Sequence, residues 1–375
     1  MKNYTGEDSS SGINRMFMRW ELPGFSFIKQ WLRQRKPKPV SKVIPPEFIT
    51  MDAALHNLAE QQMIPGMGIA IFKKEEISML QGYGYADLKK KTPVDPAKTL
   101  FRAASVSKPI AAAALANLVA EGRIDLDASY YDYVPYYPKK DYDFTIRQLA
   151  AHTAGIRAYR GKEYALNRPM SIKDSLKVFQ EDPLVFPPGS DYLYNSFDWV
   201  MLSLAMEEVT GVSFESYVKH TVLDPLGLKN TMPEAPDISK KNQAVCYSRW
   251  GSRFKKATPV DNRYKLAGGG YLTTVEDLIR FGKVILEKKF CPEAMDQFLS
   301  PQKVKGKSTY YGLGWQVSED SKGRPYFGHI GNQVGGYSYF KIFPESGLII
   351  AALVNCSDPG IQEVLDGIGE EFQNP

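Results

Sequence analysis

Apolar residues follow strand-like patterns near both ends of the chain. Short runs that are apolar or alternate between apolar and polar fall at residues 66–72, 78–85, 312–317, 337–343 and 348–354. Helical spacing is found at residues 48–62, 105–122, 171–180, 198–209, 214–220 and 274–286, and in a closing helix around residues 361–368. Strands therefore come from both ends of the sequence, with a mainly helical segment between them.

This arrangement predicts an α/β protein of two intimately joined domains. Segments 43–104 and 256–375 are expected to form the sheet-containing domain, and residues 105–255 a helical domain inserted into it. Residues 1–42 are expected to be a basic extension.

Composition changes this picture little. With 375 residues, 43% hydrophobic and 24% charged, the chain is of ordinary globular type. Residues 1–42 hold nine basic and three acidic residues, a net charge of +6. The whole chain has a net charge of +5, so the rest of it carries −1. We therefore expect no nucleic-acid partner for the folded part.

The three cysteines and four histidines lack metal-ligand spacing, so neither a metal nor another cofactor is expected.

The segment 17–38 interleaves aromatic and aliphatic residues with basic ones. This pattern fits either a flexible extension or weak contact with an anionic membrane surface. The sequence shows no bilayer-spanning stretch and no signal-peptide pattern. We expect a cytoplasmic protein, with a periplasmic or membrane-associated location as the alternative.

The most informative polar pattern is Ser105-Val-Ser-Lys108, at a predicted helix start. One helical turn brings the hydroxyl and the amine together, and a partly desolvated lysine is able to take a serine proton. The spacing alone is not specific, because Ser-x-x-Lys recurs at Ser26, Ser216, Ser252, Ser300 and Ser338.

Two later segments supply the missing context. Residues 187–196 predict a turn that delivers Tyr194 and a hydroxyl just before a helix. Gly328-His329-Ile330-Gly331 comes before the strand pattern at 337–343, which predicts an amide-rich edge strand beside a cleft. His152, in a Leu-x-x-His-Thr-x-Gly phrase, is interpreted as structural.

The order Ser-x-x-Lys, Tyr-x-[Asn/Ser], His-x-Gly resembles the serine β-lactamase-like and penicillin-binding hydrolases, in the branch with class C β-lactamases, family VIII esterases and D-aminopeptidases. The resemblance covers about residues 48–372 and includes the linking phrases at 149–156, 224–228, 266–274 and 311–315. It implies a β-lactamase/transpeptidase-like fold: an antiparallel sheet flanked by helices, an inserted helical domain, and an active site between them.

The resemblance also implies roles for individual residues. Ser105 is the expected acylated nucleophile, Lys108 the amine hydrogen-bonded to it, and Tyr194 the proton acceptor in acylation. Ser196, where the family often has Asn, is expected to orient Lys108 and a substrate carbonyl.

The third motif implies the oxyanion hole and the substrate class. The backbone N–H groups of Ser105 and Asn332, next to Gly331, are expected to bind the oxyanion. His329 replaces a lysine that β-lactamases use near a substrate carboxylate, which favours esters, small amides or short peptides as substrates. The alternatives are a β-lactamase or D-alanyl-D-alanine peptidase, and a catalytically weak scaffold or filament-forming relative. The oligomeric state stays open.

Overall fold

The computed structural model describes residues 46–235, 241–251 and 253–373. The chain divides into two compact units, Met1–Asn57 and Leu58–Pro375, and helix α3 (Pro46–Glu60) contains the boundary between them. No helix among the described residues is long and apolar enough to cross a membrane.

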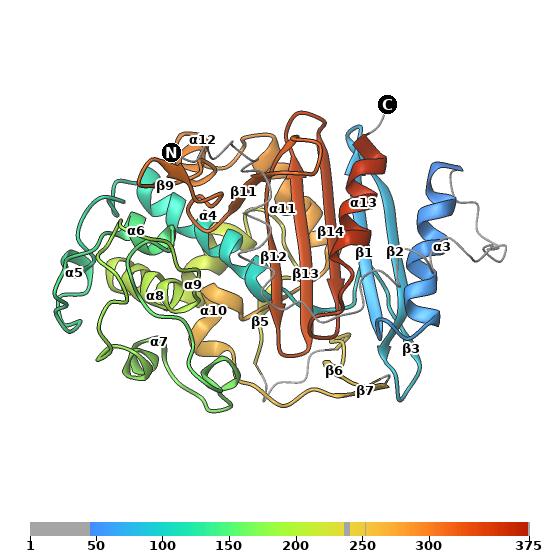
Figure 1. Ribbon diagram of the computed structural model, residues 1–375, viewed down its shortest axis with the longest axis horizontal. Helices are drawn as coiled ribbons and strands as arrows, with labels where there is room; N and C mark the ends of the chain where they lie inside the picture. Colours follow the sequence, from blue (N-terminus) through green and yellow to red (C-terminus); the bar gives the residue numbers. More distant parts are fainter. Residues whose placement is uncertain (1–45, 236–240, 252, 374–375) are drawn as a thin grey trace, which may run out of the picture. The chain divides into compact units, whose positions relative to one another are not determined.

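An antiparallel sheet of seven strands forms the centre of the second unit (Figure 1). The strand order is β11-β12-β13-β14-β1-β2-β3, and the C-terminal strands join the N-terminal ones where β14 pairs with β1. The strands are β1 (Gly66–Lys73), β2 (Glu76–Asp87), β3 (Thr92–Pro93), β11 (Gln316–Glu319), β12 (Pro325–Gln333), β13 (Gly336–Phe343) and β14 (Leu348–Val354). The predicted antiparallel sheet built from both ends of the sequence is confirmed.

Helices cover both faces of this sheet, because successive side chains of a strand point to opposite sides. Ile349 lies against Gly282 of α11 (Val275–Leu286), whereas Ile350 lies against Gly369 of α13 (Gln362–Gln373). This explains why β14 is apolar at every position.

The helical block lies beside the sheet and shares its apolar core (Figure 1). Its elements are α4 (Ser107–Ala120), α5 (Tyr130–Tyr133), α6 (Ile146–Ala150), η3 (Glu163–Ala165), α7 (Ile172–Ser175), η4 (Leu176–Val178), α8 (Phe197–Thr210), α9 (Phe214–Val218) and the π-helical turn η5 (Lys219–Leu223). The helix expected at 171–180 is thus split into two short turns. Helix α8 ends at Thr210, one residue beyond the predicted 198–209, and is capped by Gly211, whose φ of 72° suits glycine.

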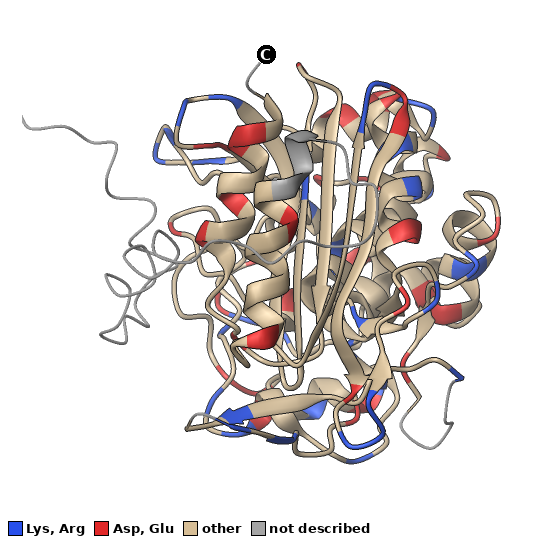
Figure 2. Ribbon diagram, turned by 90° about the vertical axis from the view of Figure 1, so that its right-hand side faces the viewer, with Lys and Arg blue, Asp and Glu red and all other residues tan. Residues whose placement is uncertain are grey.

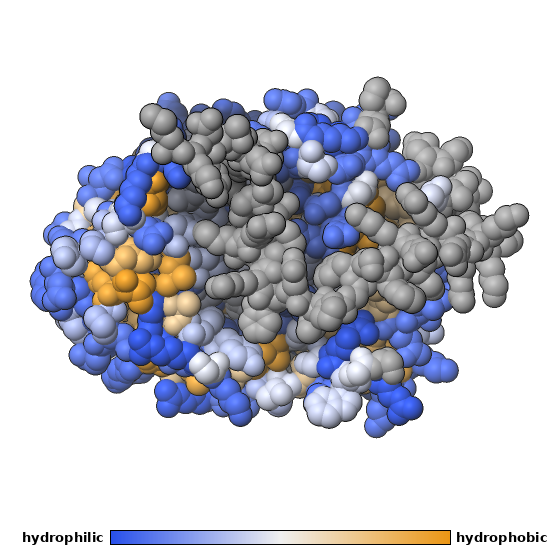
Figure 3. All heavy atoms as spheres, in the orientation of Figure 1, coloured by the Kyte–Doolittle hydropathy of each residue, from blue (hydrophilic) through white to orange (hydrophobic). Residues whose placement is uncertain are grey.

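Short elements complete the unit. They are the strands β4 (Phe101–Arg102), β5 (Met232–Pro233) and β8 (Tyr271–Thr273) of a small sheet, the hairpins β6–β7 (Tyr247–Trp250, Arg253–Lys256) and β9–β10 (Lys303–Val304, Lys307–Ser308), and the helices η2 (Ala104–Val106), η6 (Arg263–Lys265), α10 (Leu266–Gly269) and α12 (Pro292–Phe298). Figure 2 shows charged positions distributed over many of these elements, and Figure 3 shows a mainly hydrophilic surface with an apolar area over the helical block.

Two of the strand predictions were wrong. The strand expected at 312–317 begins only at Gln316, because Gly314 has a φ of 82° that no strand residue adopts. The strand at 337–343 is not an edge strand, since β13 pairs with β12 on one side and β14 on the other. Strand β12 was not predicted, because its glycines weaken the strand pattern in the sequence. Gly328 is required there because it packs so closely on the Phe340 carbonyl that a Cβ has no room.

A buried ion pair joins the small sheet to the turn between β12 and β13. Arg102 Nη2 donates to Glu234 Oε1 at 2.6 Å, both side chains are almost fully buried, and Arg102 also donates to the Val334 carbonyl. Asn262 Nδ2 donates to the other Glu234 oxygen at 2.8 Å. This cluster fixes β4, which leads directly into the turn that carries Ser105.

Replacing Glu234→Gln should therefore lower the free energy of unfolding by about 3 kcal/mol, because it leaves the Arg102 charge buried without its counter-ion. Urea unfolding followed by circular dichroism measures this change. Asp174→Asn, which breaks the exposed Lys177–Asp174 pair, is the control and should leave the unfolding midpoint unchanged. Equal effects of the two substitutions would contradict this assignment.

Candidate active site

Ser105 lies on a strained turn immediately before an alanine-rich helix. The turn η2 (Ala104–Val106) precedes α4, so the helix begins at Ser107 and not at Ser105 as the sequence suggested. Ala104 has a φ of 47°, a conformation unfavourable for a residue with a Cβ. This turn brings Ser105 onto the same side as Lys108, in the first turn of α4.

The three expected catalytic side chains meet at the Ser105 hydroxyl. Tyr194 Oη donates to Ser105 Oγ at 2.8 Å, and Lys108 Nζ lies 3.3 Å from the same oxygen. Lys108 Nζ also donates to the Gly268 carbonyl at 2.9 Å and lies 4.7 Å from the centre of the Tyr194 ring. The structure thus brings together residues separated by up to 89 positions in the sequence.

Burial controls the protonation of Lys108. The side chain is fully buried, and burial lowers its pKa to about 7, opposed by the negative charge of Asp198 and assisted by the positive charge of Lys265. Among the described residues, no carboxylate lies within ion-pair distance of the amine. An appreciable fraction of Lys108 is therefore neutral near pH 7 and able to accept a proton.

Tyr194 differs from Lys108 in its protonation. Burial raises the pKa of Tyr194 well above its usual range, which the hydrogen bond with Ser105 opposes only in part. The phenol therefore keeps its proton at neutral pH and donates it to Ser105 Oγ. A phenol with a raised pKa does not favour the role of proton acceptor in acylation that the resemblance implied for Tyr194.

A buried polar network holds the segment that carries Tyr194. Asp198 Oδ2 lies 2.7 Å from His152 Nδ1 and accepts from Asn195 Nδ2 at 2.7 Å, while Asn195 Oδ1 accepts from the Asp198 amide. The Leu193 amide donates to the His152 carbonyl at 2.9 Å, and the His152 ring packs on Tyr194 with centroids 4.6 Å apart. His152 and Asp198 act as positioning residues for Tyr194.

The sequence analysis missed Asn195 and Asp198 in this network. Asn195 was interpreted only as part of the turn at 187–196, and Asp198, in the first turn of α8, only as part of a helical pattern. Burial raises the pKa of Asp198 well above its usual range and lowers that of His152 well below its own. The nearby Lys108 charge favours the ionised form of Asp198, so the two groups stabilise each other's charge.

The edge of β12 lies beside Ser105. Strand β11 pairs with β12 only as far as Gly328, and the Ile330 amide points away from β13 to the Gln316 side chain. Backbone amides two residues apart in a strand point to the same side, so the Asn332 amide also points away from β13. A Cβ at Gly331 would lie 2.5 Å from Ser105 N, so glycine is required for this close approach. This arrangement is compatible with an oxyanion hole formed by Ser105 and Asn332.

The side chain of Asn332 is turned away from the candidate oxyanion hole, since its Oδ1 accepts from the Asp358 amide at 2.9 Å.

Ser196 lies against Gly268, where an added Cβ would be 3.1 Å from Ser196 Cβ. No hydrogen bond joins Ser196 Oγ to Lys108 within the described part of the chain. Ser196 thus borders the Lys108 site without contacting the amine directly.

His329 is buried on β12 with both ring nitrogens occupied. Nδ1 donates to the Ile330 carbonyl at 2.7 Å, so Nε2 is the acceptor for Tyr311 Oη at 3.0 Å. Burial, with the Lys108 charge, lowers the pKa of His329 to about 3. A neutral imidazole with both nitrogens bonded inside the protein is poorly suited to bind a substrate carboxylate.

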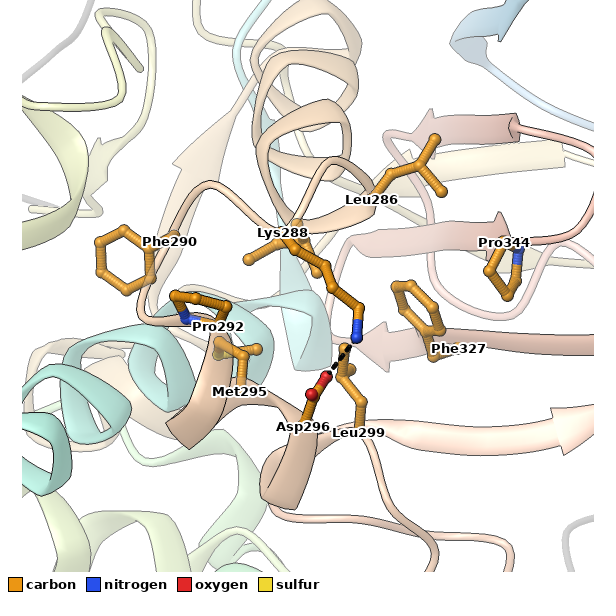
Figure 4. Close-up of a pocket in the computed structure, with 10 residues that line it drawn as sticks. Leu286, Lys288, Phe290, Pro292, Met295, Asp296, Leu299, Phe327 and Pro344 are labelled. Carbon is orange, nitrogen blue, oxygen red and sulfur yellow. Dashed lines mark hydrogen bonds and ion pairs between the residues drawn. The ribbon is translucent and has the colours of Figure 1, made fainter.

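A separate apolar pocket lies away from these side chains, between α11, α12 and the sheet (Figure 4). It has a volume of about 60 Å³, and the Lys288–Asp296 ion pair at 2.8 Å lies beside it. It is lined by Ile285, Leu286, Lys288, Phe290, Pro292, Met295, Asp296, Leu299, Phe327 and Pro344. It contains none of the candidate catalytic residues.

Comparison with known proteins agrees with this geometry. The sequence profile of the Beta-lactamase family matches residues 51–367. The chain belongs to the Beta-lactamase family. The predicted β-lactamase/transpeptidase-like fold and the resemblance on which it was based are therefore confirmed.

The individual proteins to which the chain is similar are distant from it in sequence. The mitochondrial serine beta-lactamase-like protein LACTB of Homo sapiens is 26% identical, over 94% of this chain and 84% of its own length. The penicillin binding protein from Bacillus halodurans is 25% identical, with a TM-score of 0.73 over 84% of this chain and 98% of the other. The D-amino acid amidase from Ochrobactrum anthropi SV3 shares the fold at 19% identity, with a TM-score of 0.74 over 86% and 99% of the two chains.

The Asp198 charge predicts a specific pH effect. Lys108 loses its proton as the pH rises through about 7, so the rate at which a fluorophosphonate labels Ser105 should rise through that pH. Asp198→Asn removes a carboxylate whose ionised form raises the Lys108 pKa. The midpoint of the labelling profile should therefore move to lower pH, by roughly one pH unit.

Asp277→Asn is the matched control, because Asp277 is also a buried carboxylate but is bound by Thr231 and the Asn230 amide of another region. It should leave the midpoint in place even if it lowers stability. An unchanged midpoint in Asp198→Asn, or the same change in both variants, would show that Asp198 does not act on Lys108.

Proposed function

We propose that the protein is a serine hydrolase that forms an acyl-enzyme on Ser105 and acts on esters, small amides or short peptides. The observation that supports this most strongly is the convergence of the Lys108 amine and the Tyr194 hydroxyl on Ser105 Oγ. A scaffold without catalysis does not require this hydrogen-bonded arrangement or a buried amine of lowered pKa.

In the proposed acylation step, neutral Lys108 takes the proton from Ser105 as Oγ attacks the substrate carbonyl carbon. The Ser105 and Asn332 amides stabilise the oxyanion that forms. Tyr194 then passes a proton to the leaving group and is reprotonated from Lys108. This order follows from the opposite pKa directions of the two groups, and it places Lys108, rather than Tyr194, as the first acceptor.

Deacylation reverses the roles of these groups. A water in the place of the leaving group gives its proton through Tyr194 to Lys108, and its oxygen attacks the acyl carbon. Ser105 regains its proton as the acid product leaves. The step needs no group beyond the side chains described.

The proposed substrates lack an essential carboxylate next to the scissile bond. His329 is neutral, and Ile330 and Tyr311 already occupy its nitrogens, so the third motif offers no cation to such a group. We therefore expect slow turnover of penicillins and faster hydrolysis of short-chain aryl esters or aminoacyl amides. A panel of p-nitrophenyl esters, D- and L-aminoacyl amides and nitrocefin tests this, and a clear preference for nitrocefin would contradict it.

The nucleophile itself is tested by covalent labelling. A fluorophosphonate should modify Ser105 in the native protein and fail to modify Ser105→Ala, as read by peptide mass spectrometry. Lys108→Ala and Tyr194→Phe should each reduce the labelling rate by about 10²-fold or more, and the double variant should lose little further because both serve one proton transfer. Ser107→Ala is the control for a general effect on α4, because the buried Ser107 hydroxyl accepts from the Tyr271 amide at 3.3 Å. Labelling that survives Ser105→Ala would refute the proposal.

A further inference from the structure

The β6–β7 hairpin presents two different faces. Residues paired across the two strands share a face, and successive pairs alternate between faces. The pairs Arg249↔Phe254 and Trp250↔Arg253 therefore lie on opposite faces. Each face is confirmed by a ring contact: Arg249 lies over the Phe254 ring, and Lys255 lies over the Trp250 ring.

The inner face is anchored to the rest of the second unit. Tyr247 is buried, and its hydroxyl accepts from the Leu88 amide at 2.9 Å. Arg249 donates to the Met63 carbonyl. The base of the hairpin packs on the turn between β12 and β13, where Gly335 lies against Cys246. The hairpin therefore has a fixed orientation, with its second face outward.

The outer face combines a large aromatic ring with positive charge. Trp250 is 68% exposed, the most exposed of the large apolar side chains described. Lys255 Nζ lies 3.5 Å from the centre of its ring, and Arg253 is directly across the ladder. From Ala244 to Val260 the sequence has four basic residues and no acidic one.

A second cationic element lies beside the hairpin. The β2–β3 turn contains Lys89, Lys90 and Lys91, all exposed, and the Leu88–Tyr247 hydrogen bond joins this turn to the hairpin base. Figure 1 shows β3, β6 and β7 at the same end of the sheet, and Figure 2 shows blue positions on the hairpin at the bottom of the view. Two separate parts of the sequence thus contribute basic side chains to this end, and Asp87, the last residue of β2, accepts from the Lys89 and Lys90 amides.

We propose that the outer face of the β6–β7 hairpin, with the β2–β3 turn, docks on an anionic lipid bilayer. An indole ring is favoured at the level of the lipid headgroups, where its apolar body and its N–H group are both accommodated. Lys and Arg side chains around it attract acidic headgroups. A nucleic acid or an acidic protein would use the charges but would not account equally well for an exposed Trp on a fixed hairpin tip. This inference does not depend on the proposed hydrolase activity.

Co-sedimentation of the full chain with lipid vesicles tests the proposal. The protein should bind vesicles of phosphatidylcholine mixed with phosphatidylglycerol and should bind vesicles of phosphatidylcholine alone much more weakly. Trp250→Ala should reduce the partition coefficient by about tenfold, and the double change Arg253→Glu with Lys255→Glu by about tenfold or more. Raised salt should weaken wild-type binding.

The β9–β10 hairpin provides a matched control, since Lys305 and Lys307 are exposed there and no aromatic ring among the described residues lies under either amine. Lys305→Glu with Lys307→Glu changes the net charge equally and should reduce binding far less. Residues 1–42 are present in every variant, so their contribution cancels. Quenching of Trp250 fluorescence by brominated lipids, measured as the difference between the wild type and Trp250→Phe, reports insertion directly.

Three outcomes would overturn the proposal. These are wild-type binding that is absent on anionic vesicles, hairpin variants that bind as well as the wild type, and control variants that lose as much binding as the hairpin variants. Tight binding of single-stranded DNA that is lost in the hairpin variants, without vesicle binding, would instead assign this face to nucleic acid.

Discussion

The withdrawal of the Lys108 amine from water is the constraint on which the site depends. Burying an ammonium ion costs free energy when neither water nor a directly bound carboxylate compensates its charge. Burial therefore favours the neutral amine. The surroundings of α4 are closely packed: its run of alanines is buried, and Gly314, before β11, leaves space for Ala112 and the Trp199 ring. The Gly268 carbonyl and Ser105 then hold the amine in place.

Each element that carries a candidate catalytic group is held in place by a second set of buried polar contacts. The Arg102–Glu234 pair fixes the strand before Ser105 and reaches the turn after β12. The network of His152, Asn195 and Asp198 fixes the segment of Tyr194. Because these contacts are buried, losing one partner leaves an unsatisfied polar group, and the geometry at Ser105 is held rigidly.

The sequence predicted the fold well where its patterns are long and apolar. The continuous run of β14 and the spacing of α8 and α11 specify their structures almost residue by residue. The prediction failed at β12, because its glycines serve close packing against neighbouring backbone and not a turn. That distinction depends on contacts between distant segments, which local patterns do not contain.

The candidate site shows the same division. Ser105, Lys108 and Tyr194 were identified by motifs, and the structure places them in contact. The Gly268 carbonyl had no signal in the sequence because it acts through its backbone, and Asp198 appeared as an ordinary polar residue of a helix. The sequence also did not reveal that both ring nitrogens of His329 are hydrogen-bonded inside the protein, because Tyr311 lies beside β12 only in the folded structure.

The pKa of Lys108 is the most direct test of this account. It can be measured by nuclear magnetic resonance on protein labelled with ¹³C at the lysine ε carbon, with the Lys108 signal assigned by its absence in Lys108→Ala. We predict a titration midpoint at about pH 7, well below the ordinary lysine value of 10.5. A midpoint near the usual value of 10.5 would show that Lys108 stays charged at neutral pH, and would contradict its role as the acceptor of the Ser105 proton.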